Sequence, residues 1–306
     1  MNKNEVTILD AGMGRNLRTR GVEIPATIWS ANALIVAPEI VVDIHKENIK
    51  AGASLITTNS YGVIKADLAK ENIADQFESL NQSAGQLARR AVEESDAKVE
   101  IAGSLPPLNG SYRPDRVMKR EVIEPLYLEQ ASILAPFVDF FICETMSSVG
   151  EALAAASAAL KTGKPVLVAL TLDDEKFCCL RSGESLAEAL DKLSSLNLLG
   201  VLANCCLPER ISEAIPILSA FGSAYCGGYA NAFTHVPKDW MLDGTQEEDG
   251  LLELRRDLEP DQYSSFVQDW INQGANIVGG CCGTTAEHTA ANSALVSSLQ
   301  EARISP

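Results

Sequence analysis

The chain has 306 residues, of which 46% are hydrophobic and 22% charged, so it can bury a full core and is not intrinsically disordered. Its 41 acidic residues outnumber its 25 basic residues and give a formal net charge of −16 at pH 7. This balance argues against nucleic acid and against an anionic membrane surface as partners. Because the sequence lacks a membrane-length apolar run and a secretory-type leader, we expect a cytoplasmic protein.

Short apolar runs alternate with longer amphipathic stretches along the whole chain. The runs are rich in Val, Ile, Leu and Phe and mostly do not alternate with polar residues, which is typical of strands buried on both faces of a parallel sheet. We predict strands at 6–9, 54–57, 99–102, 140–143, 166–170, 200–203, 224–226 and 276–278, and helices at 38–51, 73–95, 120–135, 149–162, 185–195, 209–220 and 260–273. Eight such units favour an α/β fold, a single (β/α)8 TIM barrel over residues 1–306, with an open doubly wound sheet as the alternative.

Two loop segments bear on this choice. The turn after the first strand, residues 10–14, lacks the Gly-x-Gly-x-x-Gly spacing of a dinucleotide loop, because Arg15, Asn16 and Leu17 follow Gly14. The stretch 227–259 is long for a barrel loop, and we expect it to cover the mouth of the barrel. Its acidic cluster, Glu247, Glu248 and Asp249, is interpreted as a solvated surface.

Eight cysteines include three adjacent pairs, two of which follow predicted strands. Cys281 and Cys282 come directly after the eighth strand, flanked by Gly279, Gly280 and Gly283, at the end of a barrel strand where active sites lie. We expect Thr284 or Thr285 to cap the next helix, with Thr284 and Glu287 in capping-box spacing, and a helix N-terminus there favours thiolate.

The sixth strand ends in the same way, at Asn204, Cys205 and Cys206. Strand ends converge at the mouth of a barrel, so Cys205 can meet Cys281 and Cys282 despite the sequence separation. Three thiolates around one point suit Zn²⁺ and leave a fourth position open, as in catalytic sites. The alternative is that these cysteines are small buried hydrophobic side chains, which is our interpretation of Cys143, Cys178, Cys179 and Cys226.

The segment 279–285, Gly-Gly-Cys-Cys-Gly-Thr-Thr, followed by Glu287 and His288, resembles the homocysteine S-methyltransferase family. Further blocks are similar to the family in the same order: 9–14, 20–21, 29–31, 38–39, 45, 51–53, 56–61, 102–105, 144–145, 204–205 and 229–231. The resemblance extends over essentially the whole chain. It implies one barrel, without appended cobalamin or folate modules, that acts on small molecules.

The resemblance also implies roles for individual residues. Zinc would be held by Cys205, Cys281 and Cys282 and would bind the homocysteine sulfur as its fourth ligand. Cys205 is preferred to Cys206 because the family's ligand directly follows Asn. Binding to the cation removes the thiol proton yet leaves a nucleophilic sulfur, which would attack an activated methyl group, most plausibly on a sulfonium.

The amino-acid part of homocysteine needs its own contacts. The resemblance implies Glu144, with Thr145 beside it, and Asp10 for the ammonium group, and the amides of the Ala11–Gly12 turn through Gly14 for the carboxylate. Alone, these residues are equally well explained by a capping Asp10 and a Glu144 paired with an arginine. Side chains at other strand ends are candidates for the donor pocket or for structural hydrogen bonds: Asn59, Tyr61, Tyr229 and Asn231. Trp29 is assigned to packing, and so are His45 and His288, which are not expected to bind the metal.

The sequence departs from the family pattern at Ala11 and Ala203, where glycine is common, and along 104–115, which leaves the donor open among S-methylmethionine, S-adenosylmethionine and betaine. A thiol or selenol other than homocysteine is an alternative acceptor. Two alternatives come from other classes: a non-catalytic redox switch built on the cysteine pairs, and a metal-free barrel enzyme that uses Glu144 as a general base.

Overall fold

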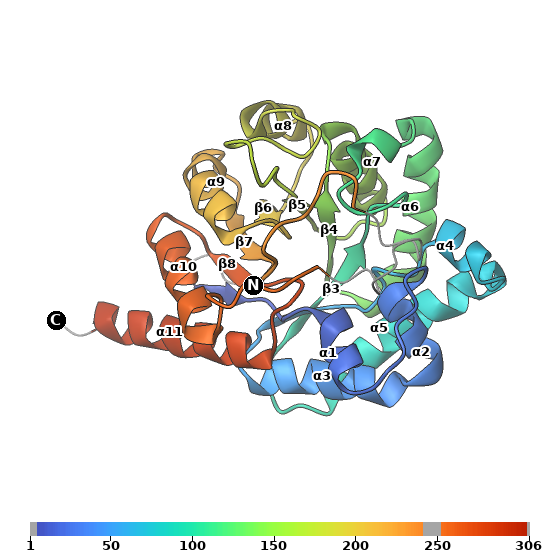
Figure 1. Cartoon of the computed structure of the whole chain (residues 1–306), viewed down its shortest axis with the longest axis horizontal. Helices are drawn as coiled ribbons and strands as arrows, with labels where there is room; N and C mark the ends of the chain where they lie inside the picture. The colour runs from blue at the N-terminus through green and yellow to red at the C-terminus, as the bar shows by residue number, and fades with distance from the viewer. Residues whose placement is uncertain (1–4, 241–251, 305–306) are drawn as a thin grey trace.

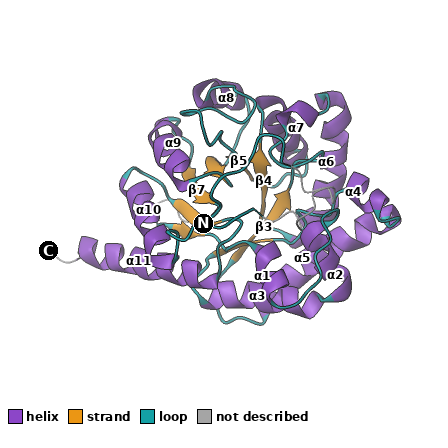
Figure 2. Cartoon of the chain, viewed as in Figure 1, coloured by secondary structure: helices purple, strands orange, loops and turns teal. Residues whose placement is uncertain are grey.

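Eight parallel strands form one sheet that curls into a barrel surrounded by helices (Figures 1 and 2). The structure is a computed structural model that describes residues 5–240 and 252–304. The predicted TIM barrel is confirmed. The strands are β1 (Thr7–Ile8), β2 (Leu55–Thr57), β3 (Glu100–Leu105), β4 (Phe140–Met146), β5 (Val166–Leu170), β6 (Gly200–Asn204), β7 (Tyr225–Ala230) and β8 (Ile277–Gly280).

The helices lie outside the strands, as the connections of parallel βα units require. None of the described helices is long and apolar enough to cross a membrane. The α-helices are α1 (Met13–Thr19), α2 (Asn32–Val36), α3 (Pro38–Lys50), α4 (Lys65–Lys70), α5 (Phe77–Glu93), α6 (Arg120–Leu134), α7 (Val149–Leu160), α8 (Leu186–Leu193), α9 (Pro208–Ala220), α10 (Pro260–Asn272) and α11 (Ala286–Ile304).

The sheet closes at β1, which lies between β8 and β2. β1 pairs with β8 through Thr7 and Ile8. On its other side, β1 reaches β2 through a parallel bridge between Leu9 and Leu55 and through the Ser54 amide, which donates to the Ile8 carbonyl at 2.9 Å. A closed ring leaves no free sheet edge and brings all eight carboxyl ends to one rim.

Two buried layers hold the barrel together. The larger lies between the strands and the helices and includes apolar faces of α3, α5, α7 and α9. The second fills the barrel interior, where it comprises Leu9, Leu55, Ala102, Phe140, Ile142, Leu167, Ala169, Leu202, Tyr225, Tyr229 and Ile277. Since side chains pack the interior, a substrate pocket on the barrel axis is expected at a rim.

Element boundaries differ from the sequence predictions at informative places. Helix α1 was not predicted, because its segment carries arginines and a glycine and is only seven residues long. Strand β4 continues past the predicted residue 143 to Met146, so Glu144 and Thr145 belong to the strand itself. A register shift between Cys143 and Met146 interrupts its pairing with β5, and such bulges re-aim side chains near active sites.

Of the two threonines predicted to cap α11, the second takes this place. Thr285, not Thr284, lies in capping contact with the helix: its amide donates to Nδ1 of His288 at 3.2 Å. Thr284 instead donates its hydroxyl to the Cys281 carbonyl at 2.7 Å, and thereby holds the turn that carries the thiols. The long loop was predicted to carry Glu247, Glu248 and Asp249 at the barrel mouth; these three residues lie outside the described part of the chain.

Candidate active site

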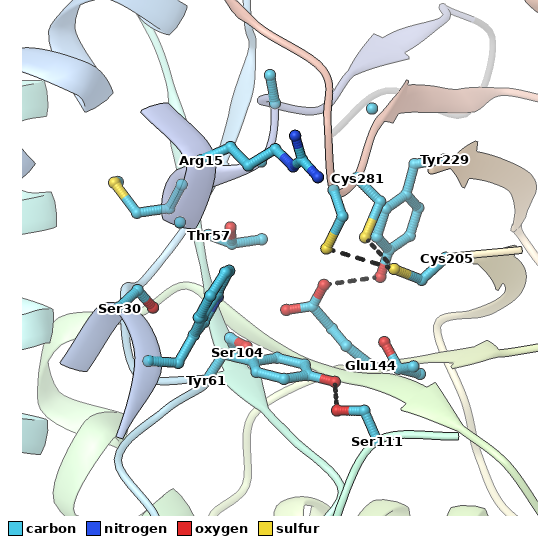
Figure 3. Close-up of a pocket in the computed structure, with 18 of the residues that line it drawn as sticks. Arg15, Ser30, Thr57, Tyr61, Ser104, Ser111, Glu144, Cys205, Tyr229 and Cys281 are labelled. Atoms are coloured by element: carbon cyan, nitrogen blue, oxygen red, sulfur yellow. Dashed lines mark hydrogen bonds between the residues drawn. The ribbon is translucent and has the colours of Figure 1, made fainter. Parts of the chain in front are cut away.

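A pocket opens at the carboxyl rim of the barrel, and residues from the ends of β1 to β4 and β6 to β8 line it. Its lining includes the three thiols, the two buried carboxylates, one arginine and several aromatic rings. Figure 3 shows Cys205 and Cys281 pointing toward one another on one side of the pocket and Tyr61 on the other. The sequence-predicted residues Asp10, Gly12, Asn59, Glu144 and Thr145 all belong to this lining.

The three sulfurs form a cluster. The Sγ atom of Cys205 lies 2.7 Å from that of Cys281 and 3.8 Å from that of Cys282, and all three lie within 4.8 Å of one another. In a tetrahedral zinc site with Zn–S bonds of about 2.3 Å, neighbouring sulfurs are separated by about 3.8 Å. The three thiols therefore suit a metal ion with three protein ligands: the Cys205–Cys282 separation matches this spacing, and the shorter Cys205–Cys281 separation would widen around a bound ion.

Cys206, the alternative ligand at the end of β6, does not join this cluster. It is fully buried in the layer between strands and helices, and burial raises the pKa of its thiol well above the usual range. Cys205 faces the pocket because its backbone adopts a left-handed conformation with φ +51°, which turns the chain just after β6. Strain of this kind at a non-glycine residue is typical of functional sites.

Backbone hydrogen bonds from the end of β7 hold both thiol-bearing turns. The amide of Cys205 donates to the Tyr229 carbonyl at 3.0 Å, and the amide of Cys281 donates to the Ala230 carbonyl at 2.8 Å. The side-chain amide of Asn231 donates to the Cys205 carbonyl at 3.0 Å. Asn231 is fully buried and supports the turn that carries Cys205; the substrate contact predicted for it stays a prediction.

The three thiols shift one another's pKa values. Hydrogen bonds from Cys205 and Cys281 hold the pKa of Cys282 well below its usual range, and the charge of Arg15 acts in the same direction. Burial raises the pKa of Cys205, and the hydrogen bond with Cys205 raises that of Cys281. One thiolate thus forms readily, whereas three together require a cation to offset their mutual repulsion.

Two carboxylates lie beside the sulfurs. Asp10, after β1, accepts a hydrogen bond from the Thr57 amide at 3.0 Å, and burial raises its pKa to about 8. Glu144 accepts a hydrogen bond from the Tyr229 hydroxyl at 3.0 Å, and burial raises its pKa to about 7. Asp10 does not cap a helix here, because Gly12 is the N-cap residue of α1. The described hydrogen-bond partners of Glu144 are the hydroxyls of Ser104 and Tyr229, not an arginine.

The turn after β1 is built against the cysteine backbone. A side chain at Gly12 would place its Cβ 2.5 Å from the Cys281 carbonyl oxygen, so only glycine fits. The amides of Ala11 and Gly12 already donate to Asn48 and Thr284, at 3.1 and 3.4 Å. Gly12 is thus needed for close packing, and the carboxylate contact predicted for the amides of residues 11–14 stays a prediction.

Two further polar residues that line the pocket are tied to the scaffold. Asn59 donates to the Ser30 carbonyl at 3.0 Å, next to Trp29. The amide of Thr145 donates to the Asn204 side chain at 2.9 Å, and Thr145 has a left-handed φ of +60°. These bonds set the side chains without closing the pocket over them.

Some lining residues were not predicted from the sequence. Arg15 extends from α1 toward the thiols (Figure 3), and Tyr112 places its hydroxyl 2.9 Å from the Cys205 sulfur. Phe233 and Trp240 complete an apolar wall. The available signals were weak: Arg15 directly follows the first turn, and Tyr112 lies in the unusual segment 104–115. Both histidines near the family blocks are packing residues, with His45 buried on α3 and His288 bonded to Thr285.

The fold and pocket define the class: a TIM-barrel enzyme with a cluster of three thiols, able to hold a metal ion, at its catalytic rim. Residues 7–296 match the family model described as homocysteine S-methyltransferase, so the chain belongs to this family of methyltransferases. It is 27% identical over 312 residues to the homocysteine S-methyltransferase of Escherichia coli (strain K12), covering 95% of both chains.

Solved structures of the E. coli homocysteine methyltransferase MmuM share this fold. The metallated form superposes with a TM-score of 0.78 at 23% identity, covering 95% of this chain and 96% of that one. The oxidized form superposes with a TM-score of 0.79 at 24% identity over the same shares.

Proposed function

We propose that this protein transfers a methyl group from a sulfonium donor to the sulfur of homocysteine, giving methionine, with Zn²⁺ held by Cys205, Cys281 and Cys282. The observation that carries the proposal is the cluster of three sulfurs within 4.8 Å at the catalytic rim of a barrel of this family. The whole chain, residues 1–306, is proposed to act as one barrel unit. Its partners would be these small molecules alone.

Bound zinc would supply a Lewis acid that keeps the substrate sulfur ionised at neutral pH. The chain's own residues supply position. Glu144, oriented by Tyr229, is proposed to bind the ammonium group of homocysteine, with Asp10 as a second acidic neighbour. The pKa of Glu144 is raised to about 7 by burial, and an ammonium group arriving beside it would favour its charged form.

The donor would occupy the side of the pocket opposite the sulfurs, where Trp29 and Tyr61 present aromatic surface. Aromatic faces attract a cationic methyl carrier. In the transfer, a bond forms between the homocysteine sulfur and the methyl carbon. The bond from the donor sulfur to that carbon breaks, and its electron pair leaves with a neutral thioether. In-line placement and exclusion of water would be the main contributions of the protein.

The direct test is to incubate zinc-loaded protein with homocysteine and, separately, with S-methylmethionine, S-adenosylmethionine or betaine, and to quantify methionine. We expect about one zinc per chain and product with a sulfonium donor. If betaine is the one donor that gives product, the sulfonium assignment is rejected. If product forms from another thiol or a selenol but not from homocysteine, homocysteine is rejected as the acceptor. Metal-free protein that forms no methionine with any donor even after zinc is added would contradict the proposal.

A further inference from the structure

The Tyr112 hydroxyl approaches one of the three clustered sulfurs. Its oxygen lies 2.9 Å from Sγ of Cys205. Among the described residues, the Cys281 thiol donates to the Cys205 sulfur, and the Cys282 sulfur accepts from the Cys205 thiol. A metal-bound thiolate carries no proton, so with metal present the phenol must be the donor. The hydrogen bond therefore marks Cys205 out from the other two ligands.

Such a distinction matters when four sulfurs surround one cation. Each thiolate is a nucleophile, and an activated methyl group can be captured by a cysteine as well as by the substrate. Capture by a cysteine forms an S–CH3 bond on the protein, breaks the donor's bond to that carbon and leaves a thioether in place of a thiolate. A charge-assisted hydrogen bond withdraws electron density from its acceptor and lowers its nucleophilicity.

We propose that Tyr112 is a positioning residue that steers methyl transfer to the substrate sulfur, because its hydroxyl donates to Cys205 and suppresses methylation of that ligand. The proposal rests on the metal centre of the proposed function. It adds a role for a residue in segment 104–115, where the chain departs from the family pattern.

The surroundings of Tyr112 are built to hold its hydroxyl in place. The side chain is buried at 3% exposure, and its backbone adopts a left-handed φ of +65°. The Arg181 guanidinium lies 5.2 Å from the centre of its ring, and the Trp240 ring packs edge-on at 5.5 Å. These contacts restrict the movement of the ring and so hold its hydroxyl near Cys205.

The same network holds the cysteine loop. Arg181 lies 3.6 Å from the Asp174 carboxylate, and both side chains of this ion pair are buried. Asp174 in turn accepts a hydrogen bond from the amide of Leu207, two residues after Cys205, at 3.1 Å. The buried Arg181–Asp174 ion pair thus contacts both the Tyr112 ring and the loop that carries Cys205.

The test compares Tyr112→Phe with Tyr61→Phe. Both variants lose one phenol oxygen from the same pocket, but the Tyr61 hydroxyl bonds Ser111 at 2.7 Å rather than a sulfur. Zinc-loaded protein without homocysteine is treated with methyl iodide, whose carbon–iodine bond breaks as iodide leaves. Added methyl groups are then counted by intact-protein mass and located by peptide mapping.

We expect Tyr112→Phe to methylate Cys205 about threefold to tenfold faster than the unaltered protein, and Tyr61→Phe to match the unaltered protein. A second readout uses Co²⁺ in place of zinc, where a more electron-rich sulfur moves the sulfur-to-cobalt charge-transfer band to lower energy in Tyr112→Phe only. An unchanged rate with an unchanged band would overturn the inference, and so would methylation spread evenly over the three cysteines. If the unaltered protein binds neither metal, the metal centre itself fails, and this role fails with it.

Discussion

The two sides of the pocket are built differently. On the sulfur side, β6, β7 and β8 deliver the thiols through backbone hydrogen bonds, such as that from the Cys281 amide to the Ala230 carbonyl. On the opposite side, the loop after β2 delivers Asn59 and Tyr61 through side-chain bonds to Ser30 and Ser111. Backbone bonds hold a geometry whatever the side chains are, whereas side-chain bonds change with single substitutions. We therefore expect the sulfur side to determine whether chemistry occurs and the other side to determine which donor is used.

The largest expected effect breaks the sulfur side. Cys205→Ser removes one of three thiolates, and we expect metal affinity to fall by at least about a hundredfold, with methionine formation falling in parallel. Cys206→Ser is the matched control, since it alters the neighbouring thiol that is buried away from the cluster. Metal content and product are measured on both. Retention of metal by Cys205→Ser together with its loss from Cys206→Ser would reverse the ligand assignment.

A smaller effect is expected where the two sides meet, at Glu144. Glu144→Gln keeps the hydrogen bond to Tyr229 but loses the charge, and we expect the KM for homocysteine to rise about tenfold to a hundredfold. Metal content and the KM for the donor are expected to stay unchanged. Steady-state kinetics with each substrate varied separately checks this. A rise in the KM for the donor alone would show that Glu144 contacts the donor and not homocysteine.

The rear of β4 offers a test of stability separate from the site. The carboxylate of Glu151 on α7 accepts hydrogen bonds from Ser147, and burial raises its pKa from 4.5 to about 7. A raised pKa means that the folded state favours the protonated acid. The stabilisation is therefore complete below pH 4.5 and is lost as pH rises through 7.

We expect this group to lower the free energy of unfolding by about 2 kcal/mol between pH 5 and pH 7. Glu151→Gln is expected to remove that contribution to the pH dependence. Urea unfolding of both proteins across this range is the measurement. Parallel pH profiles for the two proteins would show that Glu151 does not carry the effect.

The smallest effect is expected on the donor side. Asn59→Ala removes the hydrogen bond to the Ser30 carbonyl that orders the turn next to Trp29. We expect the KM for the donor to rise about threefold to tenfold, with metal content and the KM for homocysteine unchanged. Loss of metal from Asn59→Ala would show that the two sides are not separable.

Short apolar runs and the cysteine positions were enough to predict the barrel and to place two thiol-bearing segments at its rim. Strand periodicity and burial on both faces are local properties, and the parallel order of eight strands then brings their ends together. The preference for Cys205 over Cys206 came from the resemblance of Asn204 and Cys205 to the family. The sequence alone was therefore enough to propose the three cysteines and the two carboxylates as site residues.

Tertiary structure alone decided what each neighbouring group does. Asn231 and Gly12 stand in family-like segments, yet the fold uses one to hold the Cys205 carbonyl and the other to let two backbones approach. Tyr112 and Arg15 reach the cluster from segments far away in sequence, and no local pattern encodes such a meeting. The physical reason is that sequence periodicity specifies which face a residue occupies, whereas a hydrogen-bond partner depends on the path of a second segment, and only packing of the whole barrel sets that path.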